Sequence, residues 1–195
     1  MTSVAKQFVA CNWVPSRITE DDLEKMASIG GLGPKEVLHW RAPGKECPPQ
    51  PKEGEVIVFF DHLARGFNPP GSKKFHDVLA DFQLHPQDIG PNSISNICNF
   101  QVFSEAYLQE EPSVELFRDF FHLNHQTEFH DGPNTELGGM SSQKRKDVSF
   151  PHTTLHSHPK EWKQTWFYCI ETSPEGENPL PGYRPYRVTA DHPFP

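Results

Sequence analysis

Three histidines close together are the residues of this chain best suited to metal chemistry. His152, His156 and His158 lie within seven positions of the stretch FPHTTLHSHPKEW. A structural zinc site needs four ligands at fixed spacing. On a helix His152 and His156 would share a face, but the flanking prolines oppose a helix. On a strand His156 and His158 would share a face, and the site would still need Cys169 or a distant histidine as a further ligand. We therefore expect a polar, partly exposed loop, without a metal or cofactor.

A short basic run is the candidate for nucleic-acid binding. It consists of Lys144, Arg145 and Lys146. Trp162 and Trp166 follow it, and aromatic rings beside basic residues can stack on nucleobases. Three charges are few, however, and residues 75–140 hold eleven acidic residues against one base, a sum of −10 that repels phosphate. We expect the run to lie at a strand edge, where bases discourage further pairing, and nucleic acid not to be the partner.

Three further pairs have residue types that occur in catalytic and metal sites. They are Asp61 with His62, His122 with His125, and Arg118 with Asp119. Such residues more often occupy the polar face of a helix than a catalytic site. We therefore assign no catalytic residue.

The composition is that of one domain with tails. The 195 residues carry 18 basic and 26 acidic side chains, and the 20 prolines are about twice the usual ~5% share. The four cysteines form no C-x-x-C pair, which fits a reducing compartment. No apolar run reaches the ~20 residues that span a bilayer, and none near the start has the length of a signal peptide. We expect an intracellular protein, nuclear or cytoplasmic, that does not contact a membrane.

The apolar spacing predicts a helical bundle over residues 54–124. Apolar residues recur at helical intervals in GEVIVFFDHLARG, and again after Ser72, a residue suited to cap a helix. The segment after Pro91 is apolar on several faces, with Tyr107 among its apolar residues, and PSVELFRDFFHL has one phenylalanine stripe. The predicted core is Val56, Phe59, Phe60, Leu63, Phe75, Val78, Leu79, Phe82, Ile94, Ile97, Phe100, Phe103, Val114, Phe117, Phe120 and Phe121.

Outside the bundle we expect three lesser regions. Residues 1–52 should hold one helix, capped by Thr19 and ended by Gly30, and then a proline-rich linker. Residues 138–171 should form a β-hairpin-like element, because QTWFYCI alternates as a strand does and MSSQKRKDVSF could pair with it. Residues 172–195 have too little apolar material to pack and should be a disordered tail. The predicted fold class is mainly α: four to five helices, the β element and the tail.

The order of these segments resembles a plant domain family. The run from GEVIVFFDHLARGF to ELFRDFFHL, with a later GG turn and WKQTWFYC, is similar to the family catalogued as "putative transposase, gypsy type", which occurs beside gypsy-class retrotransposons of grasses. The similarity covers residues 53–171 as one domain, and ENPLPGYRPYR also resembles the sequence that follows it, which implies a truncated copy. The family has no established activity, so the resemblance supplies no site residues.

Motifs of retroelement enzymes are missing from the sequence. It has no D-[ST]-G of an aspartic protease, no paired-aspartate polymerase motif, and no C-x-x-C to complete an integrase zinc module with His152 and His156. We expect a non-catalytic helical module encoded by a gypsy-type element, acting through protein contacts such as self-association or binding of other element-encoded proteins. The alternatives are an active transposase or nuclease and a nucleic-acid-binding component.

Overall fold

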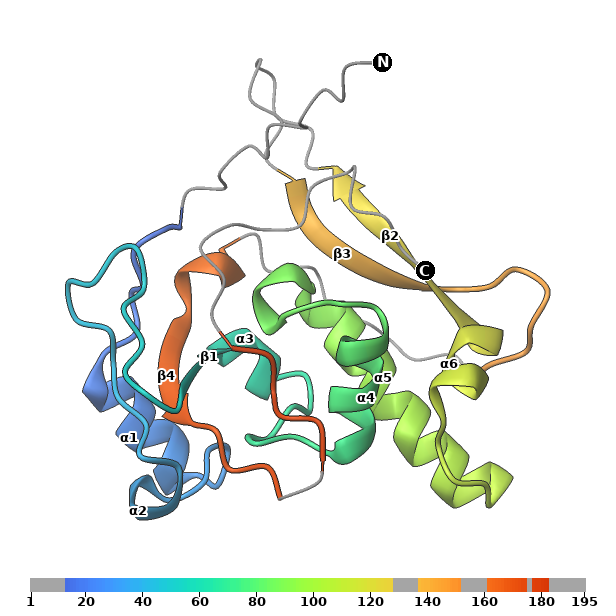
Figure 1. The fold of residues 1–195 in the computed structure, drawn as a ribbon, viewed down its shortest axis with the longest axis horizontal. Coiled ribbons are helices and arrows are strands. Elements are labelled where there is room, and N and C mark those ends of the chain that lie inside the picture. Colours follow the sequence, from blue (N-terminus) through green and yellow to red (C-terminus); the bar gives the residue numbers. More distant parts are fainter. Residues whose placement is uncertain (1–12, 128–136, 152–160, 175–176, 183–195) are drawn as a thin grey trace, which may run out of the picture.

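The fold of this protein is a mixture of helices and two small antiparallel sheets. The computed structural model describes residues 13–127, 137–151, 161–174 and 177–182 (Figure 1). One sheet pairs β1 with β4 and the other pairs β2 with β3, and helices α3, α4 and α5 lie between them in Figure 1. The predicted helical bundle is therefore wrong.

Strand β1 (Glu55–Phe59) occupies the segment in which the sequence predicts the first helix of the bundle. It pairs along its whole length with β4 (Trp166–Ile170), and helix α3 (Phe60–Leu63) begins only after it. Consecutive β-branched residues favour an extended chain. Both faces of this strand are buried, so its sequence lacks the alternating polar residues that would identify a strand. The apolar residues that remain happen to include a set at helical spacing: Val56, Phe59, Phe60 and Leu63.

Each face of the β1–β4 sheet contacts its own hydrophobic cluster. Val56, Val58, Phe167 and Cys169 belong to the larger cluster, which includes the buried residues of α4 and α5. The opposite face contributes to a second cluster, which consists of Trp13, Ile57, Phe59, Trp162, Trp166 and Tyr168. The alternation of QTWFYCI is therefore confirmed as a strand, and its two faces serve two cores.

The helices begin where the sequence places capping residues. Helix α1 (Glu20–Ser28) has a capping box between Thr19 and Asp22, and α4 (Lys73–Asp81) starts with the Ser72 hydroxyl accepting from the backbone N–H of Phe75. Helix α2 (Lys35–Leu38), the short turns η1 (Pro86–Asp88) and η3 (Trp162–Gln164), and the long helix α5 (Pro91–Phe103) complete this part. Helix α5 continues into a π-helical turn, η2 (Ser104–Leu108), and α6 (Val114–Phe120) follows.

The second sheet corrects the predicted hairpin. Helix α6 ends at Phe120 and the chain continues as β2 (Phe121–Thr127), which pairs with β3 (Leu137–Lys144). The segment MSSQK is therefore in a strand, but its partner is β2 and not β4. Ser142 fixes β3 on α5, because its N–H donates to the Ser93 hydroxyl and its carbonyl accepts from the Asn96 amide, at 2.7 and 3.0 Å.

The predicted core agrees well with the observed burial. Eleven of the sixteen predicted residues are buried. The others are half-buried and are Phe60, Leu63, Phe103, Val114 and Phe120. The N-terminal segment adds Leu23, Leu32, Leu38 and Trp40 to the larger cluster.

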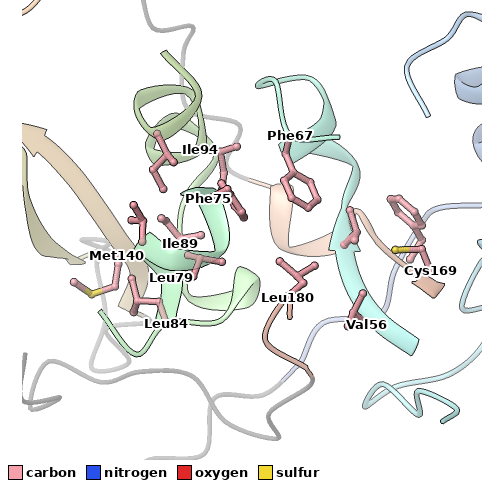
Figure 2. Close-up of a cluster of buried hydrophobic side chains, with 14 of the residues drawn as sticks. Val56, Phe67, Phe75, Leu79, Leu84, Ile89, Ile94, Met140, Cys169 and Leu180 are labelled. Carbon is pink, nitrogen blue, oxygen red and sulfur yellow. The ribbon is translucent and has the colours of Figure 1, made fainter. Parts of the chain in front are cut away.

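Residues 171–174 and 177–182 lie across the domain as a strap, so the prediction of a disordered tail is wrong for residues 172–174 and 177–182. Leu180 is 2% exposed and lies between the β1–β4 sheet and α4 (Figure 2). Its backbone N–H donates to the Glu171 carboxylate at 2.6 Å, and the carbonyl oxygen of Asn178 lies 2.8 Å from Nδ1 of the buried His76. Burial of Leu180 and these polar contacts hold the described residues of the strap on the domain.

Candidate interaction surface

The three candidate metal ligands His152, His156 and His158 lie outside the described residues. Within the part of the chain that the structure describes, no group of three or more His, Cys, Asp or Glu side chains is placed to hold a metal ion. The expectation of a metal-free loop therefore stays a prediction.

The basic run lies at the end of β3 and in the turn that follows, where all three side chains are exposed. The backbone N–H of Arg145 donates to the carbonyl of Phe120, and its Nε donates to the carbonyl of Arg118, so the turn is attached to the C-terminal end of α6. Trp162 and Trp166, which the sequence suggested as stacking partners, are 0% exposed. They pack inside the second cluster and present no ring to a nucleobase.

The candidate acid–base pairs do not converge on a common point. His62 is buried against the rings of Phe59 and Trp162, whereas the Asp61 carboxylate accepts from the Thr165 hydroxyl at 2.9 Å. Packing against aromatic rings accounts for a buried imidazole without any catalytic role.

The residues of the other two pairs also lie in positions that suggest no catalytic site. His122 lies in β2 and not on a helix, with His125 in the same strand. Arg118 pairs with Asp81 of α4 at 2.7 Å and its guanidinium lies over the ring of Phe82, which ties α6 to α4. Asp119 is exposed.

A polar network at the edge of β4 was not foreseen from the sequence. The guanidinium of Arg41 lies 3.9 Å from the ring centre of Tyr168, donates twice to Glu55, at 2.7 and 2.8 Å, and pairs with Glu46 at 2.9 Å. Burial alone would raise the pKa of each carboxyl, but hydrogen bonds from Tyr168 to Glu46 and from Arg41 to both outweigh it and lower both pKa values. These charged and polar groups satisfy one another's hydrogen bonds. Because Arg41 and Glu46 belong to the N-terminal segment and Glu55 and Tyr168 to the sheet, the network joins the two.

Half-buried aromatic rings form a continuous group around α6. Phe150, which follows the basic turn, contacts Phe103, Phe120 and Phe121 with ring-centre separations of 4.9, 5.4 and 4.9 Å. Phe103 also contacts Phe120 at 6.0 Å and stacks on Tyr107 at 5.9 Å. Edge-to-face and stacked pairs at these separations are attractive, so the rings support one another in fixed positions.

The solvent side of this group is unusually apolar. Of the five large hydrophobic side chains that are exposed among the described residues, Tyr107 and Leu108 lie in η2, shortly after Phe103. Tyr107 is 76% exposed, which contradicts its assignment to a helix packed on several sides. Exposed apolar groups of this kind mark interaction sites in soluble proteins. We call Phe103, Tyr107, Phe120 and Phe150, with Leu108, the aromatic surface.

A pocket of about 270 Å³ lies on the neighbouring side of α5. Phe67, Phe75, Cys98 and Val102 provide its apolar lining, and Ser72 donates to the Gln101 side chain at its rim. Burial raises the pKa of the Cys98 thiol to about 11, so this sulfur is a neutral apolar lining atom at neutral pH.

The sequence contains only a partial signal for the aromatic surface. EAYLQEEP places Tyr107 and Leu108 among polar and acidic residues, which is unusual for a buried helix. Nothing in the spacing indicates that Phe150 should join Phe103 and Phe120, because this requires the β2–β3 sheet to return the chain to α6.

Comparison with known protein families finds a match to part of the chain. Residues 56–125 match the model of the family described as "putative gypsy type transposon", which confirms the resemblance found in the sequence. The matched segment runs from β1 into β2 and so contains three of the four rings of the aromatic surface, all but Phe150. No curated protein and no solved structure matches the chain. No helix among the described residues is both long and apolar enough to cross a membrane.

Proposed function

We propose that this chain, in which residues 56–125 match the model of a gypsy-type transposon family, is a non-catalytic module of such an element and acts by binding protein through the aromatic surface. The observation that carries the proposal is the exposure of Tyr107 and Leu108 beside rings that are already fixed by mutual packing. Aromatic residues held rigidly lose little conformational entropy on binding, and such residues dominate the energetics of protein interfaces.

The electrostatics favour a protein partner over nucleic acid. The chain has a net charge of −8, and the basic run beside the aromatic surface, Lys144–Lys146, is followed directly by Asp147. A nucleic-acid-binding surface normally presents many bases, because affinity comes largely from neutralised phosphates.

Site-specific photocrosslinking tests the proposal. A photoreactive amino acid replaces Tyr107 in the full chain, and the control replaces Ile29, which is 78% exposed at the end of α1 and outside the aromatic surface. Each protein is mixed with the other purified proteins of the element and with unmodified chain. We expect protein crosslinks from position 107 and not from position 29, and we expect Tyr107→Glu to abolish the underlying binding.

Equal crosslinking from both positions, or none from position 107, would reject the aromatic surface as the binding site. Metal-dependent cleavage of DNA by the purified chain would reject the non-catalytic assignment.

A further inference from the structure

The aromatic surface has opposite charges at its two ends, and helix α6 defines the direction between them. The helix has seven residues and is therefore about 10 Å long. Its C-terminal end holds the basic turn, through the two hydrogen bonds from Arg145 to the carbonyls of Phe120 and Arg118. Residues 144–147 contain three bases and one acid, a local charge of +2.

The N-terminal end of α6 is acidic. The link from η2 into the first turn of α6, residues 105–115, contains Glu105, Glu110, Glu111 and Glu115 and no base. All four are exposed. Glu111 pairs with Lys74 at 3.0 Å, whereas neither Glu110 nor Glu115 has an ion-pair partner among the described residues. Two carboxylates that are unpaired within the described part of the chain thus lie at this end of α6.

The basic end is also available for an ion pair. The Nζ of Lys144 donates to the backbone carbonyl of Val148, an uncharged acceptor, and no acidic side chain that the structure describes pairs with Lys144 or Lys146. Two lysines and two glutamates therefore lie at opposite ends of the aromatic surface, and none of them has a partner of opposite charge among the residues that the structure describes.

A surface with this order of charge is complementary to itself after a half-turn. In a two-fold dimer the same patch meets its own copy in the reverse direction, so the basic turn of one chain would face the acidic link of the other, and the aromatic rings would meet at the centre. We propose that the aromatic surface binds a second copy of this chain in this antiparallel, two-fold arrangement. This rests on the proposed function and names its partner.

The net charge of −8 does not prevent such a dimer in physiological salt. At an ionic strength of 0.15 M the Debye length is about 8 Å, so repulsion between the distant parts of two chains is screened while contacts across the interface persist. The order of basic, apolar and acidic parts also sets the direction of pairing, because a parallel arrangement would place like charges together.

Charge exchange tests the dimer. One variant carries Lys144→Glu and Lys146→Glu and keeps Arg145, which attaches the turn to α6. The other carries Glu110→Lys and Glu115→Lys and keeps Glu111, which pairs with Lys74. Sedimentation equilibrium measures the mass of the full chain, each variant, their equimolar mixture, and one chain with all four changes.

We expect the unmodified chain to dimerise and each double variant to have a dimer Kd at least about tenfold higher, because each would face like charges at both ends of the interface. The equimolar mixture should recover a heterodimer, and the chain with all four changes should recover a homodimer, since opposite charges again meet. Far-UV circular dichroism and thermal unfolding show that each variant is folded, so loss of association cannot be ascribed to unfolding.

An unmodified chain that stays monomeric up to its solubility limit would overturn the dimer, as would folded variants whose mixture does not recover association. Salt-sensitive binding of an oligonucleotide that Lys144→Glu with Lys146→Glu abolishes, in a monomeric chain, would assign the turn to nucleic acid instead. If the chain is monomeric but crosslinks from position 107 to another element-encoded protein, the dimer fails and the proposed function stands. If position 107 gives no crosslink at all, both fail.

Discussion

Replacement of Leu180 by alanine tests whether the C-terminal strap is part of the folded domain. Leu180 is 2% exposed, and the change removes three buried carbon atoms. At about 0.8 kcal/mol for each buried methylene, the loss of transfer free energy alone is about 2.4 kcal/mol. The cavity adds to this, and measured Leu→Ala changes in cores lie between about 2.7 and 5.0 kcal/mol. We expect a decrease of about 3 kcal/mol in the free energy of unfolding.

Urea denaturation followed by circular dichroism measures this decrease as a lower midpoint with an unchanged slope. For a chain of this size, about 3 kcal/mol corresponds to a fall in Tm of about 6–12 °C. The control is Val37→Ala in α2, where the side chain is 58% exposed and the change should stay within about 0.5 kcal/mol. A Leu180→Ala change as small as the control would show that the strap does not pack on the domain, and would restore the prediction of a disordered tail.

Two further predictions concern the core and the polar network. Phe117→Ala should lower the free energy of unfolding by about 3–5 kcal/mol, because this ring is fully buried, and Phe120→Ala should lower it by roughly half as much, because that ring is half-buried. If urea denaturation gave equal decreases for the two variants, the assignment of Phe120 to an open surface would be contradicted. Burial would raise the pKa of Glu55, but its hydrogen bonds with Arg41 lower this pKa below the ordinary value of 4.5. The ionised Glu55 therefore contributes its full stabilisation of the folded state above pH 4.5, and this contribution is lost as the pH falls further. Glu55→Gln should therefore lose less stability on acidification below pH 4.5 than the unmodified chain, and parallel urea midpoints for the two proteins over this range would refute the ion pair's role.

Local signals in the sequence were sufficient for the helices that have one polar face. Helix α4 illustrates this, because Ser72 caps it and Phe75, Val78 and Leu79 are all buried, as the spacing predicts. Strand β1 illustrates the failure. Its residues are buried on both faces, so neither a period of two nor a period of 3.6 can be read from polarity, and only its richness in β-branched residues indicated a strand.

The partners of the strands depended on long-range packing, which no local pattern contains. Strand β4 was predicted from its alternation, yet it pairs with a segment more than a hundred positions earlier. Strand β3 pairs with β2, the strand before it, and Ser142 joins it to Ser93 of α5, whereas the sequence suggested the strand after it as the partner. Strands β2 and β3 thus follow the general preference for pairing between consecutive strands, whereas β1 and β4 depart from it because tertiary packing brings them together.

The same long-range packing explains why the aromatic surface could not be recognised from the sequence. The basic run was noticed, but it was associated with Trp162 and Trp166, which the fold buries in a different cluster. Its observed neighbours, Phe120 and Arg118, come from a helix more than twenty positions earlier, and the acidic link precedes that helix. Each charged segment alone is an ordinary exposed stretch. Only when β2 and β3 bring the chain back to α6 do the two lie at opposite ends of one apolar surface, and this order of charges, unlike the net charge of either segment, can select an antiparallel copy of the chain.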